Sequence, residues 1–133
     1  MAEVHKTREF DVPADEMWRR IGDFTTVNTW LPGIESIELL DDKRRKLTMP
    51  GGVAIVEALL EEGDLTHTYE IVEGPLPVKN YRSTLSVTAT DDKSCVVDWH
   101  STFDPAEGAS ETDATAIVAM IYDAGLDGIS RTA

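Results

Sequence analysis

The stretch that decides the fold is SETDATAIVAMIYDAGLDGIS, residues 110–130 of the chain. Ser110 and Asp113, three residues apart, fit a helix-capping pair. The apolar residues that follow recur at helical spacing and share one broad stripe: Ile117, Val118, Ile121, Tyr122, Leu126 and Ile129. The spacing predicts a long amphipathic helix whose apolar face must be covered by another part of the chain.

Strand-like segments fill most of the sequence before this helix. They cover residues 34–42, 44–52, 53–64, 65–74, 78–92 and 94–105, and Asp, Gly and Pro mark the turns between them. Consecutive strands with short connections indicate an antiparallel meander. Residues 3–12 alternate like one more strand, residues 13–24 predict a short helix, and residues 25–34 predict a second brief helix or turn.

This order of elements predicts an α+β fold. A curved antiparallel sheet cannot leave its concave apolar face open to water, and the long helix with its matching stripe is the obvious cover. A sheet wrapped around one helix encloses space, and that space is the natural binding site. The length of 133 residues favours a single domain over residues 1–133.

The charge balance disfavours two classes of partner. Lys and Arg number 12 and Asp and Glu 25, so the net charge is −13. Such a chain repels phosphate backbones and anionic lipid headgroups, which argues against nucleic-acid binding. The one basic run, KRRK at residues 43–46, follows Asp41 and Asp42 and is interpreted as the solvated start of a strand.

Other features indicate a cytoplasmic protein. Cys95 is the single cysteine, so no disulfide can form within the chain. The first eleven residues carry charges throughout, and no apolar run approaches the length of a membrane span, so stable membrane insertion is not expected. Nucleotide fingerprints, phosphate loops and zinc-type His/Cys spacings do not occur, so no cofactor or metal is expected.

Two stretches carry a family resemblance: YEIVEGPLPVKNYRS, residues 69–83, and IVAMIYDAGLDGI, residues 117–129. With the order of elements, they make the chain resemble the helix-grip superfamily, which includes START domains, the birch-pollen allergen, polyketide cyclases and plant abscisic-acid receptors. The similarity is greatest to the bacterial polyketide cyclase/dehydrase-like branch related to the receptors. It implies a helix-grip fold, with a curved seven-stranded antiparallel sheet around the long helix and two short helices after the first strand.

The resemblance also implies a cavity with a movable mouth. Residues 49–52 (MPGG) match the gate loop and Pro75-Leu76-Pro77 the latch, where the two prolines would hold Leu76 over the entrance as a stiff lid. The implied ligand-binding residues are Glu57, Tyr69, Ile71, Leu76, Tyr81, Ser83, Trp99, Ile117 and Ile121. The receptors' carboxylate-gripping lysine would fall near Thr29 and their latch His-Arg is replaced here, so the cavity carries over and the hormone does not.

Strand alternation supports several of these positions and leaves their roles open. Ile55, Glu57 and Leu59 share one face, as do His67, Tyr69 and Ile71, and Tyr81, Ser83 and Leu85. An inward Glu57 could act as an acid, a base or an anchor for a ligand hydroxyl or amine, whereas an outward one would only be solvated. His67 could serve acid-base chemistry or be a hydrogen-bonded wall residue.

The remaining candidates each have two interpretations. Tyr69, Tyr81 and Trp99 suit an aromatic or terpenoid ligand or simply fill the core, and Ser83 donates a hydrogen bond or only makes room. Gly125 leaves space for a ligand under the helix or marks fraying. Trp18 and Trp30 are expected to pack the junction of helices and sheet.

The leading functional hypothesis is a protein that binds a small, largely hydrophobic molecule, such as a lipid, polyketide, terpenoid or aromatic metabolite. The alternative is a polyketide cyclase or dehydratase in which Glu57, His67 or both move protons. A protein-interaction module comes third, and a homodimer through the mouth stays open.

Overall fold

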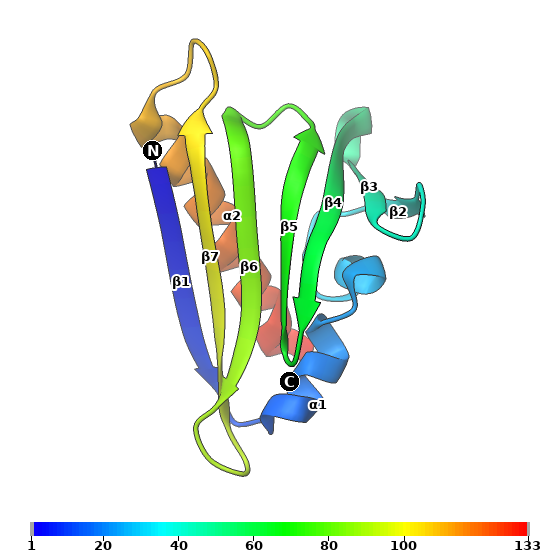
Figure 1. Cartoon of the computed structure of the whole chain (residues 1–133), viewed down its shortest axis with the longest axis vertical. Coiled ribbons are helices and arrows are strands. Elements are labelled where there is room, and N and C mark those ends of the chain that lie inside the picture. The colour runs from blue at the N-terminus through cyan, green and yellow to red at the C-terminus, as the bar shows by residue number, and fades with distance from the viewer. Residues whose placement is uncertain (1, 133) are drawn as a thin grey trace.

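The strands form one antiparallel sheet in the order β1-β7-β6-β5-β4-β3-β2 (Figure 1). The computed structural model describes residues 2–132. The strands of this part of the chain are β1 (Ala2–Phe10), β2 (Ser36–Leu39), β3 (Arg44–Met49), β4 (Val53–Gly63), β5 (Thr66–Glu73), β6 (Val78–Ala89) and β7 (Cys95–Pro105). From β2 to β7 each strand pairs with the next, and β1 pairs with β7. The predicted meander is confirmed.

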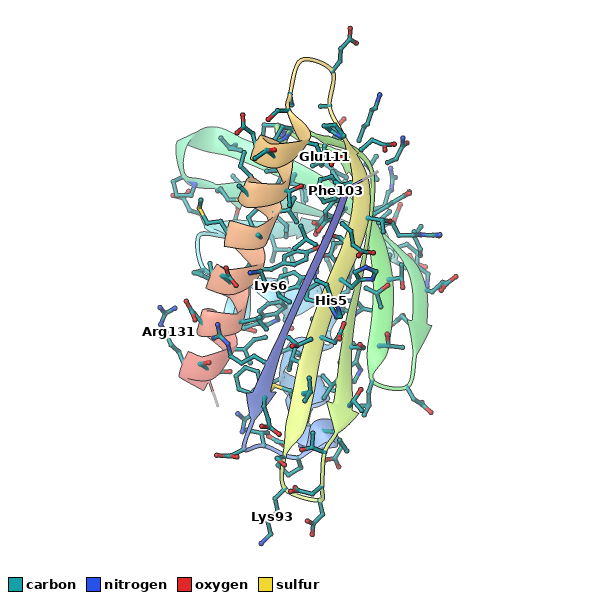
Figure 2. The ribbon with its side chains drawn as sticks, turned by 90° about the vertical axis from the view of Figure 1, so that its left-hand side faces the viewer. His5, Lys6, Lys93, Phe103, Glu111 and Arg131 are labelled. Carbon is teal, nitrogen blue, oxygen red and sulfur yellow. The ribbon has the colours of Figure 1, made fainter. Side chains whose placement is uncertain are left out.

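The helices also lie where the sequence predicts them. The short helices α1 (Ala14–Ile21) and η1 (Phe24–Thr29) follow β1, a single turn η2 (Pro50–Gly52) joins β3 to β4, and α2 (Glu111–Thr132) comes after β7. Figure 2 shows α2 lying along one face of the sheet. The predicted α+β fold, a curved seven-stranded sheet around a long C-terminal helix, is therefore confirmed.

The capping pair and the apolar stripe explain why α2 starts and packs as it does. The Ser110 hydroxyl oxygen accepts a hydrogen bond of 3.0 Å from the backbone N–H of Asp113. The fully buried part of the stripe is narrower than predicted, because Ile117 and Ile121 are only half-buried. The members that are at most 1% exposed are Val118, Tyr122, Leu126 and Ile129.

Charged side chains on the edge strand β1 also reach α2. Lys6 extends toward the helix, with its Nζ 3.5 Å from Asp123 Oδ2 (Figure 2). Arg8 donates to Asp127 Oδ1 at 2.8 Å. Because both pairs are partly exposed, each contributes little to stability, but together they join the helix to the edge of the sheet.

At Gly125, α2 packs closely against Trp99 of the sheet. The Tyr122 and Trp99 rings are stacked with centroids 4.0 Å apart. A Cβ atom on Gly125 would lie 2.6 Å from the Trp99 ring and 3.1 Å from Leu31 Cδ1. The protein itself fills the space under Gly125, so the interpretation of this glycine as room for a ligand is wrong.

None of the helices within residues 2–132 is long and apolar enough to cross a membrane.

The substitution Gly125→Ala tests the close packing of α2 on Trp99. Alanine favours a helix by about 1 kcal/mol over glycine, but its Cβ would overlap the buried Trp99 ring. We expect a net loss of about 1–3 kcal/mol in the free energy of unfolding, measured by urea denaturation. Ala116→Gly, at an exposed position of α2, is the matched control and should cost about 1 kcal/mol through helix propensity alone. A Gly125→Ala variant that is more stable than the wild type would contradict the close packing of α2 on Trp99.

Candidate functional site: a cavity between the sheet and the long helix

A cavity of about 310 Å³ lies between the concave face of the sheet and α2. Strands β3 to β7 form one wall, α2 the other, and α1, η1 and the segment after η1 close one side. The lining is mostly apolar, and its apolar members are Ile21, Val27, Trp30, Leu31, Pro32, Ile34, Leu47, Met49, Ile55, Ile71, Leu76, Leu85, Trp99, Val118, Met120, Ile121 and Ala124. The cavity can therefore hold an apolar molecule away from water.

An ion pair forms the polar end of this lining. Arg45 on β3 donates from Nε and a terminal nitrogen to Glu57 Oε1 on β4, at 2.9 and 2.6 Å. Antiparallel pairing sets Arg45 directly opposite Glu57. Both residues are buried, with 4% and 7% of their surface exposed. The guanidinium also lies 3.7 Å above the Phe24 ring centroid and donates to the Phe24 carbonyl.

His67 on β5 is the next polar group of the wall and is 3% exposed. Its Nδ1 lies 3.2 Å from the Gly22 carbonyl oxygen, which can only accept, so Nδ1 carries the proton. Burial and the nearby Arg45 charge lower the pKa of His67 from 6.5 to about 4, and the hydrogen bond to Gly22 opposes this shift. At neutral pH His67 is therefore uncharged, with Nε2 as a free acceptor.

A second polar group is a hydroxyl network beneath α2. The hydroxyls of Tyr81 and Tyr122 are hydrogen-bonded, and Ser83 Oγ lies 2.8 Å from the Tyr122 hydroxyl. Trp99 Nε1 donates to both Ser83 Oγ and the Tyr69 hydroxyl, at 3.0 and 3.1 Å. Burial raises the pKa of all three tyrosines, so their hydroxyls stay protonated.

Two loops border the cavity. Leu76 lies between the prolines of the β5–β6 loop, is half-buried and lines the cavity. That loop is held by hydrogen bonds from the Val78 N–H to the Leu76 carbonyl, 2.8 Å, and from the Ala106 N–H to the Pro77 carbonyl, 2.9 Å. Met49 lines the cavity next to η2. Met120 on α2 lines it as well but is 68% exposed, so the cavity reaches the surface there.

The structure brings most of the predicted site residues to this cavity. Those that line it are Glu57, His67, Tyr69, Ile71, Leu76, Tyr81, Trp99 and Ile121. Glu57 faces inward, so the outward alternative is wrong. Ser83 is fully buried but lies behind the lining, bonded to Trp99 and Tyr122, and Ile117 is half-buried outside it. Whether any of these residues contacts a ligand stays a prediction.

Sequence reasoning missed Arg45 and Trp30. The basic run was interpreted as solvated, but Arg45 is buried because its side chain points into the cavity. The available signal was the two-residue alternation of Arg45, Leu47 and Met49, all of which line the cavity. Trp30 was assigned to packing alone, yet it lines the cavity and its buried Nε1 has no hydrogen-bond partner.

No group of three or more His, Cys, Asp or Glu side chains within residues 2–132 is arranged to hold a metal ion.

Comparisons with known proteins agree with this architecture. The family model described as polyketide cyclase/dehydrase and lipid transport matches residues 1–133. The solved structure of the protein XoxI from Bacillus cereus is 33% identical with a TM-score of 0.94, and the match covers 99% of this chain and 95% of XoxI. An uncharacterized protein from Bacillus thuringiensis is 32% identical with a TM-score of 0.93, covering 98% of each chain.

A third solved structure shares the fold but has a low sequence identity. The Zhui aromatase/cyclase from a Streptomyces species is 16% identical with a TM-score of 0.81, and the match covers 96% of this chain and 90% of that one. No curated protein matches the chain.

The lowered pKa of His67 predicts a specific pH dependence of stability. Between pH 6.5 and about 4 the unfolded chain binds a proton at this position that the folded protein does not, so stability falls as the pH is lowered through this window. In His67→Asn this contribution is absent. We expect the advantage of the wild type over the variant in unfolding free energy to shrink by about 2 kcal/mol between pH 7 and pH 5. An advantage that is constant or grows over this range would contradict a neutral, buried His67.

The stiff-lid hypothesis predicts slow exchange in the β5–β6 loop. The amides of Leu76 and Val78 should exchange more slowly with deuterium than those of Gly51 and Gly52 in η2, measured by NMR. Replacing both Pro75 and Pro77 by Gly should accelerate exchange in this loop and leave η2 unchanged, because proline restricts the backbone. If the β5–β6 loop of the wild type exchanges as fast as η2, the lid is not stiff.

Proposed function

The chain belongs to the polyketide cyclase/dehydrase and lipid transport family of START-like helix-grip proteins, and from this premise we propose that it binds a small, largely apolar molecule in the cavity under α2. The ligand class is that of a lipid, polyketide, terpenoid or aromatic metabolite. The Arg45–Glu57 pair and His67 would orient its polar group, while the aromatic and aliphatic lining would hold the rest.

The observation that carries this proposal is the apolar lining of a cavity of about 310 Å³ in a protein of this size. Close-packed cores leave few voids larger than a water molecule, so a cavity of this volume is a feature that the fold maintains. Burying apolar surface contributes about 25 cal/mol per Å². Contact with this lining would therefore supply most of the affinity, and the few polar groups the orientation.

An enzyme of the cyclase or dehydratase type is the second candidate. One observation favours it, since Glu57 and His67 line the same cavity and both could reach one substrate. The chemistry of the two side chains favours binding instead. Glu57 Oε1 is held by Arg45, and the pKa of His67, about 4, makes it a weak base at neutral pH. His67 also caps the Gly22 carbonyl at the end of α1, which accounts for its burial without catalysis.

Two tryptophan substitutions on α2 test the binding proposal. Ile121 lines the cavity, whereas Ile117, one turn earlier and also half-buried, does not. N-phenyl-1-naphthylamine, a neutral apolar dye that fluoresces in dry environments, serves as the probe. We expect saturable binding to the wild type, a loss of affinity of about tenfold or more in Ile121→Trp, and near wild-type affinity in Ile117→Trp. Absence of dye binding to the wild type, or equal binding by the two variants, would contradict the proposal.

A further inference from the structure

The charged groups of the cavity neutralise each other. Among the lining residues that the structure describes, the oppositely charged side chains are Arg45 and Glu57, and they form a direct ion pair. His67 beside them is uncharged. A ligand that enters the cavity therefore meets a polar end with no net charge.

This polar end nevertheless has free acceptor atoms. Within residues 2–132, Glu57 accepts both Arg45 hydrogen bonds at Oε1, and His67 uses Nδ1 for Gly22. Among the lining residues that the structure describes, Trp30 Nε1 is the sealed side-chain nitrogen or oxygen without a partner. Glu57 Oε2 and His67 Nε2 also lack a partner but are not sealed off, so water can reach them. Both residues line the cavity, so a ligand that lies there is next to these two side chains.

We propose that this electroneutral end selects uncharged ligands that carry a hydroxyl group, such as a phenol or an alcohol, and excludes carboxylates of the same size. The inference rests on the proposed function, because it specifies the ligand class of the same cavity.

The selection follows from desolvation. A ligand carboxylate would leave water to meet Arg45, whose charge Glu57 already compensates, and would add a second anion near Glu57 Oε2. A hydroxyl group carries no charge to desolvate, and it can donate to Glu57 Oε2 or His67 Nε2. A hydrogen bond to a charged carboxylate is among the stronger ones, so the hydroxyl is also held in a fixed orientation.

Three matched probes test the selection on the wild type: 2-naphthol, 2-naphthoate and 2-methoxynaphthalene, each titrated at pH 7 by isothermal calorimetry. They share one ring system and differ in charge and in the O–H donor. We expect 2-naphthol to bind about tenfold or more tighter than 2-naphthoate, with 2-methoxynaphthalene weaker than 2-naphthol because it cannot donate. Equal or tighter binding of 2-naphthoate overturns the charge selection, and equal binding of 2-methoxynaphthalene overturns the hydroxyl preference.

Removing the Glu57 charge should reverse the selection. In Glu57→Gln the Arg45 cation is uncompensated, so the ratio of 2-naphthoate to 2-naphthol affinity should rise about tenfold or more. Glu61→Gln on the same strand is the matched control, since it removes the same charge from an exposed position and should leave the ratio unchanged. A ratio that is unchanged in Glu57→Gln, or that rises equally in both variants, overturns the inference.

A double variant covers the case in which Glu57→Gln does not fold. Arg45→Met with Glu57→Leu replaces the ion pair by apolar side chains of similar length, an exchange that buried pairs often tolerate. In this variant the advantage of 2-naphthol over 2-methoxynaphthalene should shrink, because His67 Nε2 is the acceptor that remains, and an undiminished advantage would overturn the role of the ion pair. If the dye fails to bind the wild type, the proposed function itself fails. If the dye binds and 2-naphthoate binds as well as 2-naphthol, only the selectivity fails.

Discussion

The long helix α2 covers the concave face of a seven-stranded sheet together with α1 and η1, and the rest of the structure depends on where α2 packs. Two residues determine the position of α2. Gly125 allows Trp99 of β7 to approach the helix closely, and Tyr122 stacks on the Trp99 ring. This contact brings α2 close to β7 and β1 at one side of the sheet. On the other side of the sheet, β3, β4 and β5 line the cavity together with α2.

The Arg45–Glu57 pair and His67 connect the cavity to the short helices. Arg45 and His67 donate to the carbonyls of Phe24 and Gly22, so the segment between α1 and η1 is hydrogen-bonded to the sheet through side chains of the cavity wall. Breaking a buried ion pair by removing one partner costs about 3–5 kcal/mol. The groups that give the cavity its polarity therefore also hold one of its walls, which explains how charged side chains can persist in an apolar lining.

The fold could be predicted from the sequence because the spacing of apolar residues and the turn residues between strands are local signals. The capping pair at Ser110, the stripe on α2 and the turn residues between strands each fixed one element. Alternation along a single strand was enough to predict that Glu57 and Tyr69 face the cavity. Arg45 was missed because a basic run usually faces solvent, although Arg45 shares a two-residue alternation with Leu47 and Met49. Gly125 was misjudged because the space beneath it depends on the position of the Trp99 ring, which only the assembled structure determines.

The central claim is that a ligand lies between the concave face of the sheet and α2. Isotope-filtered nuclear Overhauser spectra of the labelled protein with unlabelled N-phenyl-1-naphthylamine test it most directly, because they identify the side chains within a few ångströms of the dye. The account predicts contacts from the dye to Ile55, Ile71 and Ile121, which line the cavity on both walls. Contacts confined to the exposed apolar side chains Leu39, Leu60 and Val72, with none to the cavity lining, would contradict it.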